Sequence, residues 1–178
     1  MFLIEKCAVP ANVLLTRYLT DETYTDCYTT EISWQISFAE FVFAFYTTAL
    51  FKLERFILKW MVSKPSTDVQ ARQLADGVSE KFATWRVESR GENELLMCDF
   101  SGRTRSWLMG TPMNTNNGAR TRLYFGSVVV PVRNSKTGKL SLGFGVQVLL
   151  EFHKIYSVLL LNSAKSDIKR KALIDTRS

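Results

Sequence analysis

Alternating polar and apolar positions mark one clear strand near the start of the chain. In YTDCYTTEI, Tyr24–Ile32, the even-numbered side chains fall on one face and the odd-numbered ones on the other. The next segment, residues 38–62, shows helical spacing of apolar residues and begins with a capping box formed by Ser37 and Glu40. The β-branched pair Thr47-Thr48 predicts a bend or a break inside this long segment.

A shorter helix is predicted next, with Ser66 or Thr67 as its cap, Asp68 in its first turn and Gly77 just past its end. From Phe82 the period changes to two. Five runs follow, separated by turn residues: FATWRVES, ELLMCDF, RTRSWLMGT, ARTRLYFGSVVVPV and KLSLGFG. Their short connections predict an antiparallel meander. A final helix is predicted over residues 147–171, with Leu149, His153, Tyr156, Leu160 and Ala164 on one face.

This order of elements predicts the fold class α+β. A curved antiparallel sheet would wrap around the last helix, with one or two helices inserted after the first strand. The length of 178 residues suits a single domain over residues 1–178. Its core is expected at about residues 24–164, and a basic tail at residues 165–178. A composition of 46% hydrophobic and 22% charged residues argues against a disordered or fibrous chain.

The net charge of +6 adds little about partners. Many basic residues lie in the C-terminal tail, where a solvated helix end explains them better than contact with an anionic membrane surface. They are not interleaved with aromatic residues, so no nucleic-acid partner is predicted.

Cysteine usage and hydropathy predict a cytoplasmic protein. The three cysteines are widely spaced and form no CxxC pair, which argues against a disulfide framework and for a reducing compartment. The longest uncharged runs, such as residues 41–51, are far shorter than the roughly 20 residues of a membrane span. The N-terminus lacks the basic lead of a signal peptide.

His153 is the only histidine in the chain. Its place between Leu149 and Tyr156 on the final helix predicts that it points towards the sheet. A buried imidazole with one hydrogen-bond partner is favoured over contact with a ligand. Since a metal site needs several ligands, neither a metal nor another cofactor is predicted. No serine-nucleophile motif accompanies the histidine, so a hydrolase is not indicated.

Two further groups are candidates for chemistry. If Asp26 faced a cavity, its carboxylate would be desolvated and suited to acid–base chemistry. A position on the convex face of the sheet or a pair with an arginine is favoured instead. In RTRSWL, Arg105 and Trp107 share a strand face near Asp99. The arginine could fork onto the carboxylate of Asp99 or of a ligand. A solvent-facing row of cross-strand charge pairs is the favoured alternative.

The order of elements resembles that of the START-like, helix-grip superfamily, also called SRPBCC or polyketide-cyclase-like. The resemblance is carried by YTDCY, by WRVESRGENELLM followed by GRTRSWL, and by EFHKIYSVLL. Within the superfamily the chain is similar to an uncharacterised bacterial family over about residues 24–164. Six strands are predicted where seven are usual, so one more is expected in residues 2–18 or in a split of the fourth run. The resemblance implies a cavity between the sheet and the last helix that takes apolar or amphipathic small molecules.

The leading hypothesis is therefore a protein that binds a small apolar or amphipathic molecule in this cavity. One alternative is an enzyme of the cyclase or dehydratase kind in the same cavity, for which no catalytic residue is assigned. Another is an interaction module that forms a homodimer through the long first helix or meets a membrane surface through the basic tail. The candidate cavity residues are His153, Tyr156, Asp26, Tyr28, Arg105, Trp107, Trp85 and Tyr124.

Overall fold

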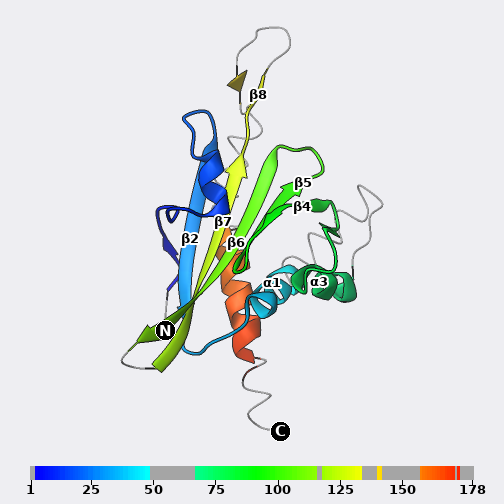
Figure 1. Cartoon of the computed structure of the whole chain (residues 1–178). Coiled ribbons are helices and arrows are strands. Elements are labelled where there is room, and N and C mark those ends of the chain that lie inside the picture. Colours follow the sequence, from blue (N-terminus) through cyan, green and yellow to red (C-terminus); the bar gives the residue numbers. More distant parts are fainter. Residues whose placement is uncertain are drawn as a thin grey trace.

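A computed structural model describes residues 3–48, 67–115, 118–133, 140–141, 157–170 and 172. Its fold class is α+β, as predicted. The strands of one antiparallel sheet follow the spatial order β1-β2-β7-β6-β5-β4-β3 (Figure 1). These strands are β1 (Glu5–Lys6), β2 (Tyr24–Ile32), β3 (Lys81–Phe82), β4 (Trp85–Arg90), β5 (Glu94–Asp99), β6 (Thr104–Thr115) and β7 (Gly118–Val129).

The described α-helices follow the order that was predicted, and a 3-10 helix that was not predicted precedes β2. The described helices are the 3-10 helix η1 (Leu14–Tyr18), α1 (Phe38–Thr47), α3 (Asp68–Ala75) and a C-terminal helix, of which residues 157–170 are described. A separate two-stranded sheet pairs β8 (Val132–Arg133) with β9 (Leu140–Ser141).

Strand β2 lies between the short edge strand β1 and the last strand of the meander. It pairs with β7 from Tyr24 opposite Val129 to Ile32 opposite Thr121. Each of the strands β3 to β6 pairs with the next along the chain, which confirms an antiparallel meander from β3 to β7. Strand β1 lies within residues 2–18, one of the two places where a further strand was expected.

Local signals set the ends of the first two α-helices. Ser37 Oγ accepts a hydrogen bond from the Glu40 backbone N–H at 3.2 Å, and Glu40 returns a bond to the Ser37 N–H, which confirms the capping box. Helix α1 ends at Thr47, where a break was predicted, and residues 49–62 of the expected long helix lie outside the described residues. Thr67 caps α3 in the same way through Gln70, and Gly77 adopts φ +75° beyond its end.

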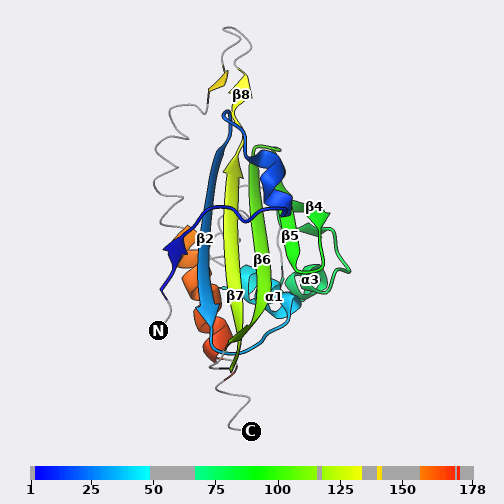
Figure 2. The same ribbon diagram turned by 60° about the vertical axis from the view of Figure 1, so that its left-hand side comes forward.

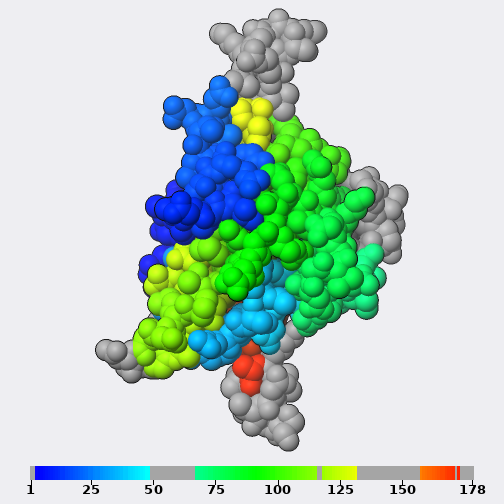
Figure 3. Space-filling view, in the orientation of Figure 1, coloured from blue at the N-terminus to red at the C-terminus, as the bar shows by residue number. Residues whose placement is uncertain are grey.

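The two faces of the sheet are covered by different parts of the chain. Figure 2 shows α1, α3 and the C-terminal helix on one side of the strands and the N-terminal segment crossing the other side. In the space-filling view this N-terminal segment, in blue, lies directly against the central strands (Figure 3). We call these the helix side and the outer side of the sheet.

Aromatic side chains dominate the core on the helix side. Phe45 contacts Tyr46 and Phe125, with ring centroids 5.3 and 5.0 Å away, and Tyr46 contacts Phe82 at 5.3 Å. Leu160 and Ala164 of the C-terminal helix are buried in the same core, in agreement with the face predicted for them. The helix and the strands therefore share one apolar interior.

One sequence prediction about the sheet was wrong in part. The fifth alternating run, KLSLGFG, was expected to continue the meander. Its described residues, Leu140 and Ser141, form β9 and pair with β8, outside the seven-stranded sheet. Strand β7 ends at Val129, two residues before Pro131, because proline cannot donate to a ladder. Period-two spacing predicted a strand in the fifth run, but not which sheet it joins.

Candidate functional site

The structure divides the candidate residues between the two sides of the sheet. Tyr28 and Trp85 pack into or against the helix-side core, and Asp26 lies on the same face of β2 as Tyr28. Arg105, Trp107 and Tyr124 lie on the outer side, so they do not line the space between the sheet and the helices. The strands were predicted correctly, but the sequence pattern did not show which side of the sheet each candidate side chain faces, because both sides are covered. His153 and Tyr156 lie outside the described residues.

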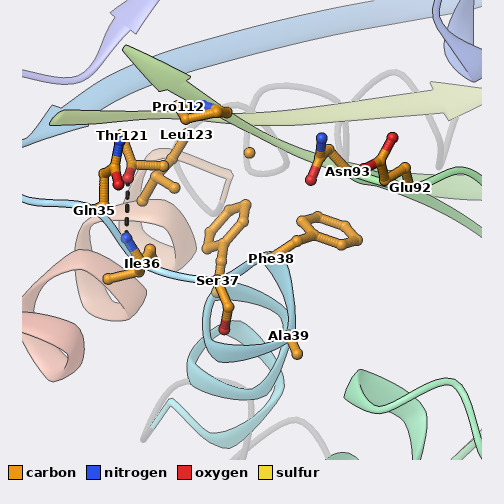
Figure 4. A pocket seen from close by; sticks show the side chains of 12 residues that line it. Gln35, Ile36, Ser37, Phe38, Ala39, Glu92, Asn93, Pro112, Thr121 and Leu123 are labelled. Atoms are coloured by element: carbon orange, nitrogen blue, oxygen red, sulfur yellow. Dashed lines mark hydrogen bonds between the residues drawn. The ribbon is translucent and has the colours of Figure 1, made fainter. Parts of the chain in front are cut away.

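A pocket of about 360 Å³ opens on the helix side, between the start of α1 and the strands β6 and β7. Its apolar wall is built from Phe38 and Phe41 of α1 and from Leu123 of β7. Figure 4 shows Asn93 and Glu92 across the pocket from Gln35, with the Phe38 ring on the side of Asn93. Glu92, Asn93 and Gln35 are exposed, whereas Phe41 and Leu123 are fully buried. The pocket thus has an apolar interior and a polar rim.

Hydrogen bonds of Thr121 hold the segment that leads into α1 against the sheet. The Thr121 hydroxyl accepts from the Ile36 N–H at 3.1 Å and donates to the Trp34 carbonyl at 3.0 Å. The hydroxyl is buried, as β7 places residue 121 on the helix side opposite Pro112. This wall of the pocket is therefore fixed by bonds to the sheet and not only by packing.

Gly110 keeps another wall of the pocket open. It lies on β6 opposite Leu123, and its backbone N–H donates to the Asn93 carbonyl at 3.0 Å. A Cβ atom built on Gly110 would meet the Phe38 ring at 3.5 Å, an ordinary van der Waals distance. A larger side chain at this position would therefore occupy pocket space without a clash with the backbone.

A smaller pocket of about 280 Å³ lies on the other flank of the segment Gln35–Ile36, between α1 and the C-terminal helix. Its lining includes Phe43 of α1 and Ile168 of the C-terminal helix. The Arg72 guanidinium stacks 3.8 Å above the centre of the Phe43 ring. Such a cation–π contact covers the ring and leaves this pocket more polar than the first.

Asp26 is the most buried carboxylate among the candidates, at 2% exposure. Its carboxylate accepts hydrogen bonds from the hydroxyl of Ser127 and, at 3.3 Å, from that of Tyr24. The favoured expectation of a convex-face position or an arginine pair was wrong, because Asp26 lies on the helix side and its described partners are hydroxyl groups. These two hydroxyl groups supply hydrogen bonds to a carboxylate that β2 places in the buried interior. Asp26 does not line either of the two pockets described above.

Lys165 brings a buried ammonium from the C-terminal helix to the same side of β2. Its Nζ donates to Thr30 Oγ1 at 2.7 Å, and that hydroxyl donates to the Leu3 carbonyl at 3.1 Å. Burial, together with the nearby charge of Lys169, lowers the pKa of Lys165. The sequence analysis assigned this residue to a basic tail, although it is only 4% exposed. Its spacing of four from Leu161, on a buried helix face, was the signal that could have placed it inside.

On the outer side, Arg105 forms a network that ties the N-terminal segment to the sheet. Its Nε donates to the Tyr18 hydroxyl at 2.9 Å and to Glu88 Oε2 at 3.1 Å. The Tyr18 hydroxyl also donates to Glu88, and burial together with this bond raises the pKa of Tyr18. The Arg105 side chain is 13% exposed, so the expected solvent-facing charge row was wrong. The alternative of a fork onto Asp99 is not formed either, since Arg105 bonds to Glu88 while Asp99 accepts from the backbone of residues 103 and 104.

Trp107 is anchored on the outer side by Glu94. One carboxylate oxygen of Glu94 accepts from the Trp107 indole N–H at 2.9 Å and from the Leu14 backbone N–H at 2.8 Å. Tyr124 packs beside Trp107, with ring centroids 6.2 Å apart. Sequence reasoning missed Glu94 and Glu88, because their partners come from a segment about seventy to eighty residues away in the chain.

No protein-family model matches the chain, and no curated protein matches it either. The resemblance to the helix-grip superfamily therefore stays a prediction. None of the helices in the described part of the chain combines the length and the apolar character that crossing a membrane requires.

Proposed function

We propose that this chain binds a small apolar or amphipathic molecule on the helix side of its sheet, and that its fold is of the helix-grip type. Two features support the fold proposal. The first long strand lies beside the last strand of the meander, and the helices that follow it pack on one side of the sheet together with the C-terminal helix. The pocket beside α1 is the described part of the proposed binding site.

The observation that carries the proposal is the contrast between the interior and the rim of this pocket. Phe38 is only partly buried and offers apolar surface beside the buried Phe41 and Leu123, and burying the apolar surface of a ligand is the main favourable term in binding. Asn93 and Gln35 offer amide donors and acceptors at the opening. Glu92, the acidic group of the rim, favours a ligand whose polar end is a hydroxyl or an amine over one that carries a carboxylate.

The first test is native mass spectrometry of freshly purified protein, followed by solvent extraction. A discrete additional mass that disappears on extraction would identify a ligand and its class. Nile red, a neutral apolar dye, then measures the site directly through the rise in its fluorescence. We expect saturable binding of one dye molecule per chain.

The Gly110 variants locate the binding. Gly110→Ala adds one methyl group that points at Phe38, and Gly110→Val fills more of the same space. We expect Nile red to bind progressively more weakly, with about a tenfold rise in Kd for the valine variant, which corresponds to about 1.4 kcal/mol. Thr111→Val is the matched control because residue 111 is the neighbour on β6 whose side chain is exposed on the other side.

Equal dye affinity in the three variants and the wild type would overturn the placement of the site. Absence of saturable binding, together with a bare chain mass, would overturn the binding function itself. The enzyme and interaction-module hypotheses would then replace it. Thermal unfolding of each variant shows that a change in dye affinity does not reflect loss of the fold.

A further inference from the structure

Two of the three cysteines lie side by side on neighbouring strands. Strand β1 pairs with β2 in a register that places Lys6 opposite Tyr28, so Cys7 comes next, opposite Cys27. The Cys7 N–H donates to the Cys27 carbonyl at 2.9 Å, and the two sulfur atoms are 3.4 Å apart. Opposite residues of a hydrogen-bonded antiparallel pair have Cα atoms about 5.5 Å apart, within the range that a disulfide spans. Both cysteines are free thiols in this structure.

The two thiols differ in access. Cys27 is 1% exposed and belongs to the outer cluster, defined as the buried residues Leu15, Cys27, Leu96, Trp107 and Val128. Cys7 is only partly buried and packs against this cluster from its edge. A small reagent can therefore reach the sulfur of Cys7 first, and Cys27 stands behind it at contact distance.

We propose that Cys7 and Cys27 are a built site for an intramolecular disulfide, formed when the chain meets a hydroperoxide. This proposal does not depend on the proposed ligand-binding function. The Cys7 thiolate attacks one peroxide oxygen, the O–O bond breaks, and the departing oxygen takes up a proton, which leaves a sulfenic acid on Cys7. The Cys27 thiolate then attacks the Cys7 sulfur, the S–O bond breaks, and the hydroxide leaves as water after protonation. The two thiols lose two protons and two electrons, and hydrogen peroxide takes these up to become two waters.

Burial raises the pKa of both thiols, which has two consequences. Less thiolate is present at neutral pH, so the first attack on the peroxide is slow compared with that of a catalytic cysteine. A thiol with a raised pKa is also a poor leaving group, so the finished disulfide resists cleavage by an external thiol. The site therefore responds to sustained oxidation rather than to brief exposure.

The disulfide would act on one identifiable part of the fold. It closes a ring that runs from residue 7 to residue 27 and contains η1, whose Leu15 is buried in the outer cluster. In the reduced chain this segment is held by packing and by hydrogen bonds of its side chains and backbone. A covalent link at its two ends would restrict its detachment from the sheet.

The test uses the full-length reduced chain under native conditions. It is treated with hydrogen peroxide and quenched, and is then unfolded in urea, alkylated with iodoacetamide and analysed by peptide mass spectrometry, since Cys27 and Cys98 are buried in the folded chain. We expect a crosslinked peptide pair that joins Cys7 to Cys27 and lacks two hydrogens, with Cys98 alkylated. Alkylation of both Cys7 and Cys27, a sulfinic acid on Cys7, or a disulfide between two chains would each overturn the proposal.

Variants separate the steps. Cys98→Ser should form the same crosslink, because Cys98 lies on β5 away from this pair. Cys27→Ser should stop at the sulfenic acid of Cys7, which dimedone traps. Hydrogen exchange on the oxidised wild type gives a readout that needs no variant. The amides of Leu14–Tyr18 should exchange about tenfold more slowly than in the reduced chain, and unchanged exchange would contradict the restraint of this segment.

Discussion

The two sides of the sheet are held to their covers by different forces. On the helix side, α1, α3 and the C-terminal helix bury a large aromatic core that includes Phe41, Phe45 and Tyr46. On the outer side, a short N-terminal segment covers the small outer cluster and is fastened by hydrogen bonds to Glu94 and Glu88. Because apolar burial scales with area, the small cover depends on directional bonds far more than the helices do.

The two sides of the sheet also differ in how tightly they are packed. The outer cluster is closely packed: a Cβ atom on Gly126 would come within 2.5 Å of Leu15 and 3.0 Å of Trp107. On the helix side, the described residues line the two pockets above, and a Cβ atom on Gly110 would meet only the Phe38 ring at 3.5 Å, an ordinary contact distance. The sheet thus has one tightly packed side and one side that retains pockets, and substitutions can test each side separately.

The largest effect is expected from Glu94→Ala. This change removes the single oxygen that accepts from Trp107 Nε1 and from the Leu14 N–H, and leaves both donors without that acceptor. We expect the free energy of unfolding, measured by urea denaturation, to fall by about 3 kcal/mol. Hydrogen exchange should locate the loss in η1.

The matched variant for this position is Glu94→Gln, which keeps an acceptor oxygen and loses only the charge. Its loss should be about 1 kcal/mol. Glu92→Ala, two residues earlier and exposed, should change stability by less than about 0.5 kcal/mol. If the alanine and glutamine variants at position 94 lose the same amount, hydrogen bonds do not fasten the N-terminal segment.

The same substitution, glycine to alanine, at one position on each side of the sheet compares how tightly the two sides are packed. Gly126→Ala forces the Leu15 and Trp107 side chains to move, and its Cβ would be 3.2 Å from the Asp26 carbonyl oxygen. We expect a loss of about 2 kcal/mol in thermal or urea unfolding. Gly110→Ala meets only Phe38 at 3.5 Å, and alanine is better than glycine in a strand, so we expect a gain of about 0.5 kcal/mol. Equal losses would mean that both sides are packed equally tightly.

A pH-dependent effect is expected from the buried ammonium of Lys165. A lowered pKa means that the folded state disfavours the charged form of Lys165. The resulting loss of folding stability is therefore full below the lowered pKa and disappears as the pH rises to the ordinary value of 10.5. The stability of the wild type should therefore increase relative to that of Lys165→Met over this alkaline window. Urea denaturation of both proteins at neutral and alkaline pH measures the difference. A difference that does not change with pH would contradict burial of the charge.

Local patterns in the sequence were sufficient for most of the elements. The alternation in residues 24–32 predicted β2, and the capping box at Ser37 predicted the start of α1. A cap at Ser66 or Thr67 predicted the start of α3, and the structure selects Thr67. These signals work because a cap or a period involves residues within a few positions of one another. The prediction that Arg105 and Trp107 line a cavity under the helices was wrong because it depended on contacts between distant parts of the chain. Period two correctly placed Arg105 and Trp107 on one face, but it does not say which face meets the helices.

The sequence by itself therefore determined the fold class, the antiparallel meander and most helix ends. Only the tertiary structure decided that Arg105 and Trp107 lie under the N-terminal segment, that Asp26 faces the helices, and that Cys7 touches Cys27. Each of these contacts joins residues that are far apart in the chain or on different strands. Their positions follow from strand order and register, and these depend on how all the apolar faces are buried together.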